Sequence, residues 1–329
     1  MVAVKYIEIE DLAGHKVVTE NDDVFRTRPK RINIITGCNG SLKTTFLETL
    51  AVSLSMITRR AFDVYEENAL QSYLRGDWLS VYELAKAGFK IKVNGYYVKT
   101  VNVDELREMG IKNAAAESGI VLYKDARPIG IFITSRFGIS RRFLNNYGEK
   151  FTYISIYLPD IMTFDFVKMF TSSVNFAKSL KLVREVLDFE GVYAKIDEHG
   201  RFTLFVINEG KEVPIHRLGR GMMNSIILAL ASSNDVVIVD NIENSLDAEA
   251  MSDVVEIMYE SGSQWFVTTY SSDFLKHVLS ERPDDVMVYR FEKKNDVLEI
   301  RQFDGGQARK VMTEGSEDLR GKCYDHDVR

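Results

Sequence analysis

The sequence is poor in cysteine, because Cys38 and Cys323 are its only two in 329 residues. Two cysteines cannot build the disulfide framework of a small secreted domain, and their scarcity is typical of the reducing cytosol. The sequence has no run of about eighteen apolar residues that would predict a membrane-spanning helix. Its first residues, MVAVKYIEIEDL, alternate like a strand and do not resemble a secretory leader. We therefore expect a cytoplasmic protein.

The sequence is also poor in proline, and it has no excess of basic residues over acidic ones. Five prolines and no low-complexity run argue against long disordered linkers. A formal net charge of -6 gives no overall electrostatic footprint for nucleic acid. The chain does contain 45% hydrophobic residues, which is enough for the core of one large α/β domain or of two average domains.

One stretch stands out, GCNGSLKTTF at residues 37–46. The β-branched run before it, residues 31–35, predicts a strand, and the apolar run after it, residues 44–57, predicts a buried helix. In the pattern G-x-x-x-x-G-K-[ST], backbone N–H groups and the helix N-terminus bind phosphate oxygens. The lysine reaches the terminal phosphates, and the hydroxyl group binds Mg²⁺. The stretch therefore predicts a nucleotide site between a strand and a helix.

The match has one departure. Gly37, Gly40, Lys43 and Thr44 agree with the pattern, but Leu42 stands where the pattern has its second glycine. Gly40 could supply the freedom of the turn, whereas a branched side chain at position 42 could crowd the lysine or the phosphates. The alternative interpretation is a strand-to-helix loop without a ligand. The candidate nucleotide-binding residues of the loop are Gly37, Cys38, Asn39, Gly40, Ser41, Leu42, Lys43, Thr44 and Thr45.

A second apolar run, residues 235–240, predicts a buried strand that ends in a carboxylate. We expect Asp240 to lie beside the Mg²⁺ ion held by Thr44, although an ordinary strand-end turn residue is the alternative. Asn241 follows, where a hydrolytic enzyme of this type has a glutamate that polarises the attacking water. An amide cannot accept that proton, and Glu243 is the nearby acid that could substitute.

Two further turns are candidate phosphate contacts. Residues 218–222, LGRGM, open a helix with two glycines, and such a turn exposes N–H groups to an anion. Gly219, Arg220 and Gly221 are therefore candidate binding residues, although the turn could be a helix cap only. Residues 268–271 end a strand where a γ-phosphate sensor is expected, so Tyr270 is a candidate sensor or a plain strand-end aromatic residue.

The order of these segments resembles the ATP-binding cassette (ABC) type of P-loop ATPase, in the branch of the SMC, RecF and OLD-like proteins. More closely it resembles the small stand-alone AAA-type ATPases grouped with that branch. The resemblance covers the N-terminal stretch and about residues 190–275. The matching segments are IEIEDLAGHK, INIITGCNGSLKTTFLETL, VPIHRLGRGMMNSIILALA, VVIVDNIENSLD and QWFVTTYSSDFL.

This resemblance implies an α/β P-loop NTPase fold of ABC-ATPase type. It has a mostly parallel sheet core flanked by helices, with an antiparallel β meander and a helical insertion. Residues 37–45 would be Walker A, Asp240 the Walker B aspartate, 218–222 the signature loop and 245–247 the D-loop. Tyr270 would stand at the position of the switch histidine. ATP and Mg²⁺ would bind, and two protomers would stack head to tail around the nucleotide.

Three positions depart from the family pattern, namely Leu42, Asn241 and Tyr270. Loss of a general base typically costs ~10²–10⁴ in rate, while the groups that bind nucleotide are kept. We therefore expect a nucleotide-dependent dimerising switch with slow or absent hydrolysis. The alternatives are a slow ATPase that uses Glu243 or a partner-supplied group, a nucleotide-free interaction scaffold, and a DNA-associated module. The basic clusters at 26–31 and 136–142 are more simply solvated surface.

The sequence divides into four segments. Residues 1–60 would be the N-terminal part of the ATPase core with Walker A, and 190–303 its C-terminal part with the signature, Walker B and switch strand. Residues 61–189 would be an inserted helical and hairpin region that could contact a protein partner. Residues 304–329 are polar and predict a loosely held tail.

Overall fold

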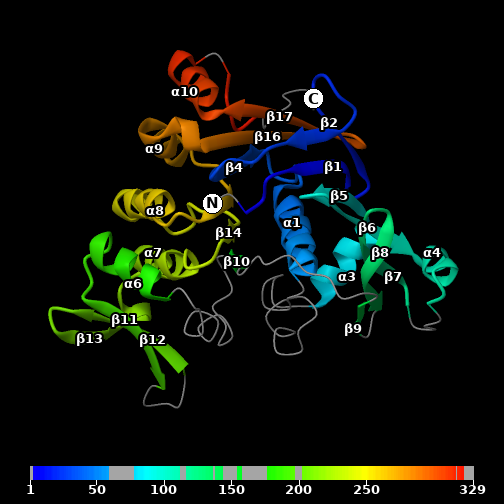
Figure 1. Ribbon diagram of the computed structural model, residues 1–329. Coiled ribbons are helices and arrows are strands. Elements are labelled where there is room, and N and C mark those ends of the chain that lie inside the picture. The colour runs from blue at the N-terminus through cyan, green and yellow to red at the C-terminus, as the bar shows by residue number, and fades with distance from the viewer. Residues whose placement is uncertain are drawn as a thin grey trace, which may run out of the picture.

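The computed structural model describes residues 3–58, 78–111, 116–135, 138–143, 154–157, 176–196, 202–315 and 317–321. Within these residues the main element is one sheet of 14 strands (Figure 1). Five neighbouring strands are parallel, in the spatial order β10, β14, β15, β4 and β16. Their bounds are Ile154–Tyr157, Val236–Val239, Gln264–Thr268, Ile32–Gly37 and Val286–Lys294.

An antiparallel half continues the sheet. Strand β17 pairs antiparallel with β16 and parallel with β2, and the order then runs β1, β5, β6, β7, β8 and β9, with β3 beside β1. The strands of this half are β17 (Val297–Asp304), β2 (His15–Val18), β1 (Ile7–Leu12), β3 (Phe25–Thr27), β5 (Phe89–Val93), β6 (Tyr96–Asn102), β7 (Ser118–Lys124), β8 (Arg127–Ser135) and β9 (Gly138–Phe143).

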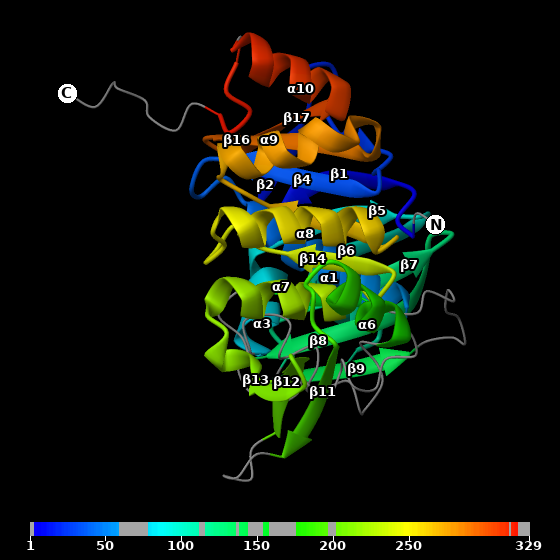
Figure 2. The ribbon, with the colours of Figure 1, turned by 90° about the vertical axis from the view of Figure 1, so that its left-hand side faces the viewer.

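Helices cover both faces of the sheet. Helix α1 (Lys43–Ile57) lies on one face together with α3 (Trp78–Ala87). A row of helices covers the other face of the parallel strands (Figure 2). The row consists of α6 (Phe176–Glu185), α7 (Arg220–Ala231), α8 (Ala248–Glu260), α9 (Ser272–Glu281) and α10 (Gly305–Glu314). A short helix, α4 (Val103–Glu108), packs on β6 and β7, and two 3₁₀ turns are η3 (Ile215–Arg217) and η4 (Pro283–Asp285).

The apolar strands are explained by burial on both faces. In β14, Val236 and Ile238 belong to the core around α1, whereas Val237 and Val239 belong to the core beneath α6 to α10. A strand covered on both faces needs apolar side chains at every position, which is the pattern that the sequence shows. The predicted α/β class is therefore confirmed, with one continuous parallel block of five strands around β4 and one further parallel pair, β17 and β2.

Several sequence predictions agree with the structure. The turn at Asn94 and Gly95 joins β5 to β6, and residues 118–135 form the strand pair β7 and β8. The predicted meander forms a separate three-stranded sheet of β11 (Gly191–Ile196), β12 (Phe202–Asn208) and β13 (Lys211–Pro214). The helical part of the inserted region predicted at 61–189 falls partly outside the described residues, which contain α3, α4 and α6.

The loosely held tail predicted from residue 304 is wrong for residues 305–315 and 317–321. Residues 305–314 form α10, which begins with a capping box in which Asp304 and Gln307 bind each other's backbone N–H groups. Leu319 is buried in the core. The division of the remaining chain at residues 60 and 189 stays a prediction, although β5 to β9 continue the same sheet as β1. None of the helices in the described part of the chain is long and apolar enough to cross a membrane.

Candidate nucleotide-binding site

The phosphate-loop sequence lies between β4 and α1, as predicted. Gly37 has φ 139°, and a Cβ atom there would lie 2.4 Å from the carbonyl oxygen of Phe291, so only glycine fits. Gly40 and Leu42 both have a positive φ, of 77° and 68°. Gly40 therefore does not replace a glycine at position 42, and Leu42 itself adopts the left-handed conformation. The Leu42 side chain packs against the hydrophobic core around α1.

The Lys43 ammonium group is buried, with 4% of the residue exposed. Its Nζ atom donates to the carbonyl oxygens of Gly37 and Cys38, each at 2.8 Å, and to the hydroxyl oxygen of Tyr270 at 2.6 Å. Nζ also lies 4.0 Å from the centroid of the Tyr270 ring. Burial lowers the pKa of Lys43 to about 8, although the nearby carboxylates of Asp240 and Glu243 act in the opposite direction.

Thr44 and Asp240 meet directly. The Thr44 hydroxyl group donates to Oδ2 of Asp240 at 2.8 Å across 196 residues of sequence, and the Thr268 hydroxyl group donates to Oδ1 at 2.5 Å. The contact arises because β4, β15 and β14 are parallel neighbours, so their carboxyl ends share one edge of the sheet.

A magnesium ion fits this pair chemically. Mg²⁺ in nucleotide sites is usually held by one or two protein oxygens together with substrate phosphates and water. The hydroxyl group of Thr44 and the carboxylate of Asp240, which is 7% exposed, provide such oxygens. Within the described residues no group of three or more His, Cys, Asp or Glu side chains could hold a metal by itself. The donor set therefore fits an ion that a phosphate also coordinates.

The three candidate catalytic residues lie around the same edge. The backbone N–H of Tyr270 donates to Oε1 of Glu243 at 2.6 Å. Glu243 Oε2 is buried and has no hydrogen-bond partner among the described residues. Burial raises the pKa of the Tyr270 phenol, and the carboxylates of Asp240 and Glu243 raise it further. Asn241 has φ 50°, and its N–H donates to Thr268 Oγ1 at 2.7 Å.

The other loop residues have varied surroundings. Ser41 is buried and its N–H donates to the carbonyl oxygen of Cys38 at 3.2 Å, while Asn39 is exposed and Thr45 is half-buried. Cys38 is disulfide-bonded, a state that the expectation of a reducing cytosol did not include. The only other cysteine of the sequence, Cys323, lies outside the described residues.

The second glycine turn lies elsewhere. Gly219 has φ 85° and stands before α7, and both Gly219 and Arg220 are exposed. A Cβ atom at Gly221 would lie 3.2 Å from the carbonyl oxygen of Ser245 and 3.3 Å from Cβ of Ala250. The turn therefore packs against the segment between β14 and α8, which contains the predicted D-loop.

Two contacts around the loop were not expected from the sequence. The first is the hydrogen bond from the Thr268 hydroxyl group to Asp240. The sequence showed only that a residue with a hydroxyl group ends the strand next to β14. The segment 317–321 packs at the base of the loop, where the Thr36 hydroxyl group donates to the carbonyl oxygen of Leu319 at 2.5 Å. Nearby, the buried Arg290 forms an ion pair with Glu317 at 2.5 Å. This second contact had no sequence signal, because the segment looked like part of a polar tail.

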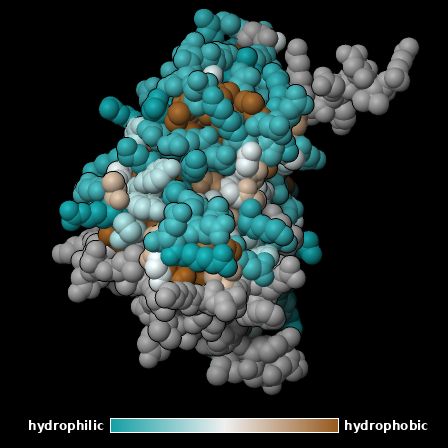
Figure 3. Space-filling model, turned by 90° about the vertical axis from the view of Figure 1, so that its right-hand side faces the viewer, coloured by the Kyte–Doolittle hydropathy of each residue, from teal (hydrophilic) through white to brown (hydrophobic). Residues whose placement is uncertain are grey.

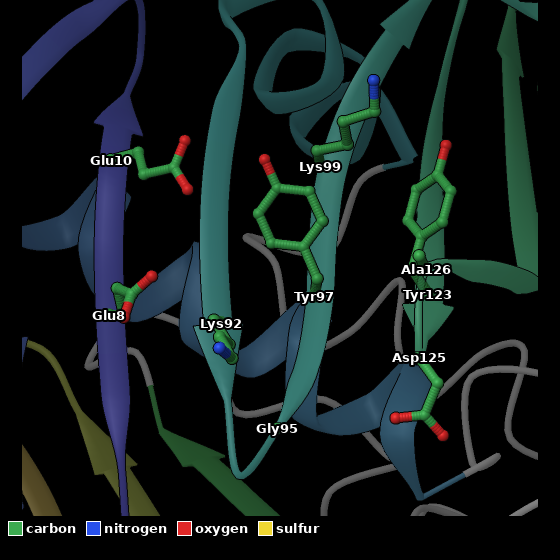
Figure 4. A pocket seen from close by; sticks show the side chains of 9 residues that line it. All are labelled: Glu8, Glu10, Lys92, Gly95, Tyr97, Lys99, Tyr123, Asp125 and Ala126. Atoms are coloured by element: carbon green, nitrogen blue, oxygen red, sulfur yellow. The ribbon is translucent and has the colours of Figure 1, made fainter.

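A separate hollow of about 530 Å³ lies on the exposed face of β1, β5, β6 and β7 (Figure 4). Glu8, Lys92, Tyr97 and Tyr123 form one row across these strands, each paired with the next. Two of the charged groups there have partners within the chain, since Glu8 pairs with Arg26 and Lys99 of the same hollow pairs with Glu105. We assign this hollow no ligand.

No protein-family model matches the sequence, and a search of curated proteins finds no match. Solved structures similar to this chain include an SMC head bound to the C-winged helix domain of ScpA, with a TM-score of 0.49, 12% identity, and 94% of this chain and 99% of that chain covered. The SMC head domain from Thermotoga maritima has a TM-score of 0.45 at 12% identity, covering 91% and 98%. An SMC head with an extended coiled coil, bound to the C-terminal domain of ScpA derived from Pyrococcus furiosus, has a TM-score of 0.44 at 13% identity, covering 95% and 99%. All three are SMC heads, the branch that the motifs resemble. At this low identity the function rests on the geometry of the site.

Proposed function

We propose that this chain is an ABC-type nucleotide-binding module that binds ATP with Mg²⁺ at the loop between β4 and α1. The observation that carries the proposal is the 2.8 Å contact between the Thr44 hydroxyl group and the Asp240 carboxylate. A hydroxyl group at the start of a helix and a carboxylate at the end of a neighbouring parallel strand are the protein ligands of Mg²⁺ in P-loop NTPases. A loop without a ligand would not require the two to meet.

Different groups of the site would bind different parts of the ATP–Mg²⁺ complex. Backbone N–H groups at the start of α1 would bind phosphate oxygens, as helix N-termini do. Lys43 would contact the terminal phosphates, and Thr44 with Asp240 would hold Mg²⁺, which neutralises phosphate charge. Leu42 is compatible with this role because its side chain packs against the core around α1.

We further propose that ATP promotes a homodimer in the cytoplasm. Gly219 and Arg220 are exposed and their turn packs beside the predicted D-loop, and we propose that this turn contacts the nucleotide bound by a second copy. The described residues on the face seen in Figure 3 are mainly hydrophilic, with small hydrophobic patches between them. In the described part of the chain, Val297 is the one large hydrophobic side chain exposed by more than a third, at 36%. Such a surface favours association that depends on nucleotide over constitutive hydrophobic pairing. A protein partner could bind through residues 61–189.

Slow or absent hydrolysis is part of the proposal, because Asn241 cannot accept a proton from water. A second candidate, a slow ATPase, is favoured by one observation: Glu243 Oε2 is buried without a hydrogen-bond partner in the described chain. An unpaired carboxylate oxygen beside the phosphate site could act as a general base. Phosphate release by the wild type, Asn241→Glu and Glu243→Ala separates the two. Rapid turnover that Glu243→Ala abolishes would replace the switch with the ATPase.

Titration calorimetry with ATP–Mg²⁺ tests binding itself. We expect the wild type to bind, and Thr44→Val to lose at least about tenfold in affinity when Mg²⁺ is present. Thr58→Val, at the other end of α1, is the control and should bind like the wild type. No heat of binding at millimolar ATP would leave the nucleotide-free scaffold as the function. The mass of the protein in solution, with and without ATP–Mg²⁺, tests the homodimer.

A further inference from the structure

The ammonium group of Lys43 has no hydrogen left for a phosphate in this conformation. An ammonium group has three hydrogens, and Nζ makes three contacts of 2.8 Å or less, to Gly37, Cys38 and Tyr270. The first two acceptors are carbonyl oxygens of the phosphate loop itself. The third is a phenol from the turn between β15 and α9, 227 residues away in sequence.

We propose that Tyr270 is a latch: its phenol occupies the place of the terminal phosphates on Lys43 and must move aside when nucleotide binds. This inference rests on the proposed function of the site. The ring lies over the ammonium group as well, with its centroid 4.0 Å from Nζ. Phosphate replaces the phenol because its negative charge adds a Coulombic attraction to the ammonium group that a neutral hydroxyl group does not provide.

The surrounding contacts indicate which part of Tyr270 moves. Its backbone N–H is held by Glu243 at 2.6 Å. The next residue, Ser271, caps α9 by accepting the N–H of Phe274 at 3.1 Å. Because the main chain is held on both sides, the side chain rotates while the turn stays in place. Glu243 therefore keeps its position when the latch opens, and only the phenol leaves the phosphate site.

The latch makes a sharp prediction for Tyr270→Phe. Removing the hydroxyl group frees one ammonium hydrogen without removing the ring, so nucleotide no longer competes for Lys43. A protein that must leave a closed state to bind has its apparent affinity reduced by the fraction that is open. We expect Tyr270→Phe to bind both ATP–Mg²⁺ and ADP–Mg²⁺ about tenfold more tightly. Tyr270→Ala, which removes the ring too, should gain at least as much.

Calorimetry and stopped-flow binding of a fluorescent ADP analogue test this latch. The gain should appear in the association rate constant, because opening precedes binding. Tyr97→Phe, in the hollow of Figure 4, is the matched control and should bind like the wild type. Thermal unfolding of each variant checks that it folds.

The outcomes distinguish the latch from the proposed function. If the wild type binds nucleotide and Tyr270→Phe binds equally well, the latch is overturned and the proposed function stands. If Tyr270→Phe loses affinity for ATP alone, Tyr270 is a γ-phosphate contact and the latch is again overturned. If neither protein binds at millimolar nucleotide, the proposed function fails and the latch fails with it. Binding by Tyr270→Phe but not by the wild type would support the latch in its strongest form.

Discussion

Leu42 has a left-handed backbone conformation, which favours glycine. Substitutions at this position separate two opposing contributions to the free energy of unfolding, the cost of that conformation and the packing of the side chain. Its φ is 68° and its ψ 19° at the start of α1. The left-handed conformation costs a residue with a Cβ atom roughly 1–2 kcal/mol. The Leu42 side chain also packs, partly buried, against the core around α1. Full burial of a leucine contributes about 1.5–3 kcal/mol, so partial burial should contribute roughly half of that.

These magnitudes predict the order of two variants. Leu42→Gly loses the packing and adds about 0.5–1 kcal/mol of chain entropy in the unfolded state, but it relieves the backbone cost. Its free energy of unfolding should stay within about 1 kcal/mol of the wild type. Leu42→Ala loses the packing and keeps the backbone cost but not the entropy cost of glycine, so it should be roughly 0.5–1 kcal/mol less stable than Leu42→Gly.

Urea unfolding followed by circular dichroism measures this order, and calorimetry with ATP–Mg²⁺ measures binding. Because the side chain of Leu42 packs against the core, we expect Leu42→Gly to change ATP affinity by less than about threefold, a difference of about 0.6 kcal/mol. Equal stability of the Gly and Ala variants would show that the left-handed conformation costs no more than the chain entropy that glycine adds, about 0.5–1 kcal/mol. A tenfold gain in affinity for Leu42→Gly would show that the leucine crowds the phosphates.

Four further substitutions test the site and its support. Gly37→Ala should destabilise the protein by about 3 kcal/mol, because its Cβ would lie 2.4 Å from the Phe291 carbonyl oxygen. Gly40→Ala meets no atom within 4 Å and should cost about 1 kcal/mol. Urea unfolding measures both changes in stability. Asp240→Asn keeps the shape of the side chain but loses its charge, so calorimetry should show at least a tenfold loss of ATP affinity in Mg²⁺ and little change without it. Arg290→Met should cost about 2 kcal/mol in urea unfolding. This is less than the 3–5 typical of fully buried pairs, because Arg290 is 3% exposed while its two carboxylate partners are 23% and 37% exposed.

The sequence was informative where one physical cause determines the pattern. Burial on both faces makes β14 and β15 apolar throughout, so their runs could be recognised as parallel strands. The phosphate-loop pattern and the carboxylate at the end of a buried strand together predict that Thr44 and Asp240 lie around one Mg²⁺ ion, and parallel strands place their carboxyl ends at one edge. The contact at 2.8 Å agrees with that prediction.

Other features depend on three-dimensional contacts that no local pattern records. The phenol of Tyr270 reaches Lys43 only through the path of the turn after β15, and the sequence indicated no more than a strand end. Likewise, β17 pairs with β2 across most of the chain. The helix after Asp304 did have a signal, the capping pair of Asp304 and Gln307, but two glycines between them resemble a loop.

The central place of β4 has a consequence for synthesis on the ribosome. Its two neighbours, β15 and β16, come from the last third of the sequence, and the Asn33 side chain donates to the carbonyl oxygen of Trp265, 232 residues further on. The nascent chain therefore carries β4 and α1, with their apolar residues uncovered, until most of the protein has been made. Such distant pairing slows folding and exposes the growing chain to aggregation. We expect an N-terminal fragment that ends before β15 to need a chaperone to remain dispersed.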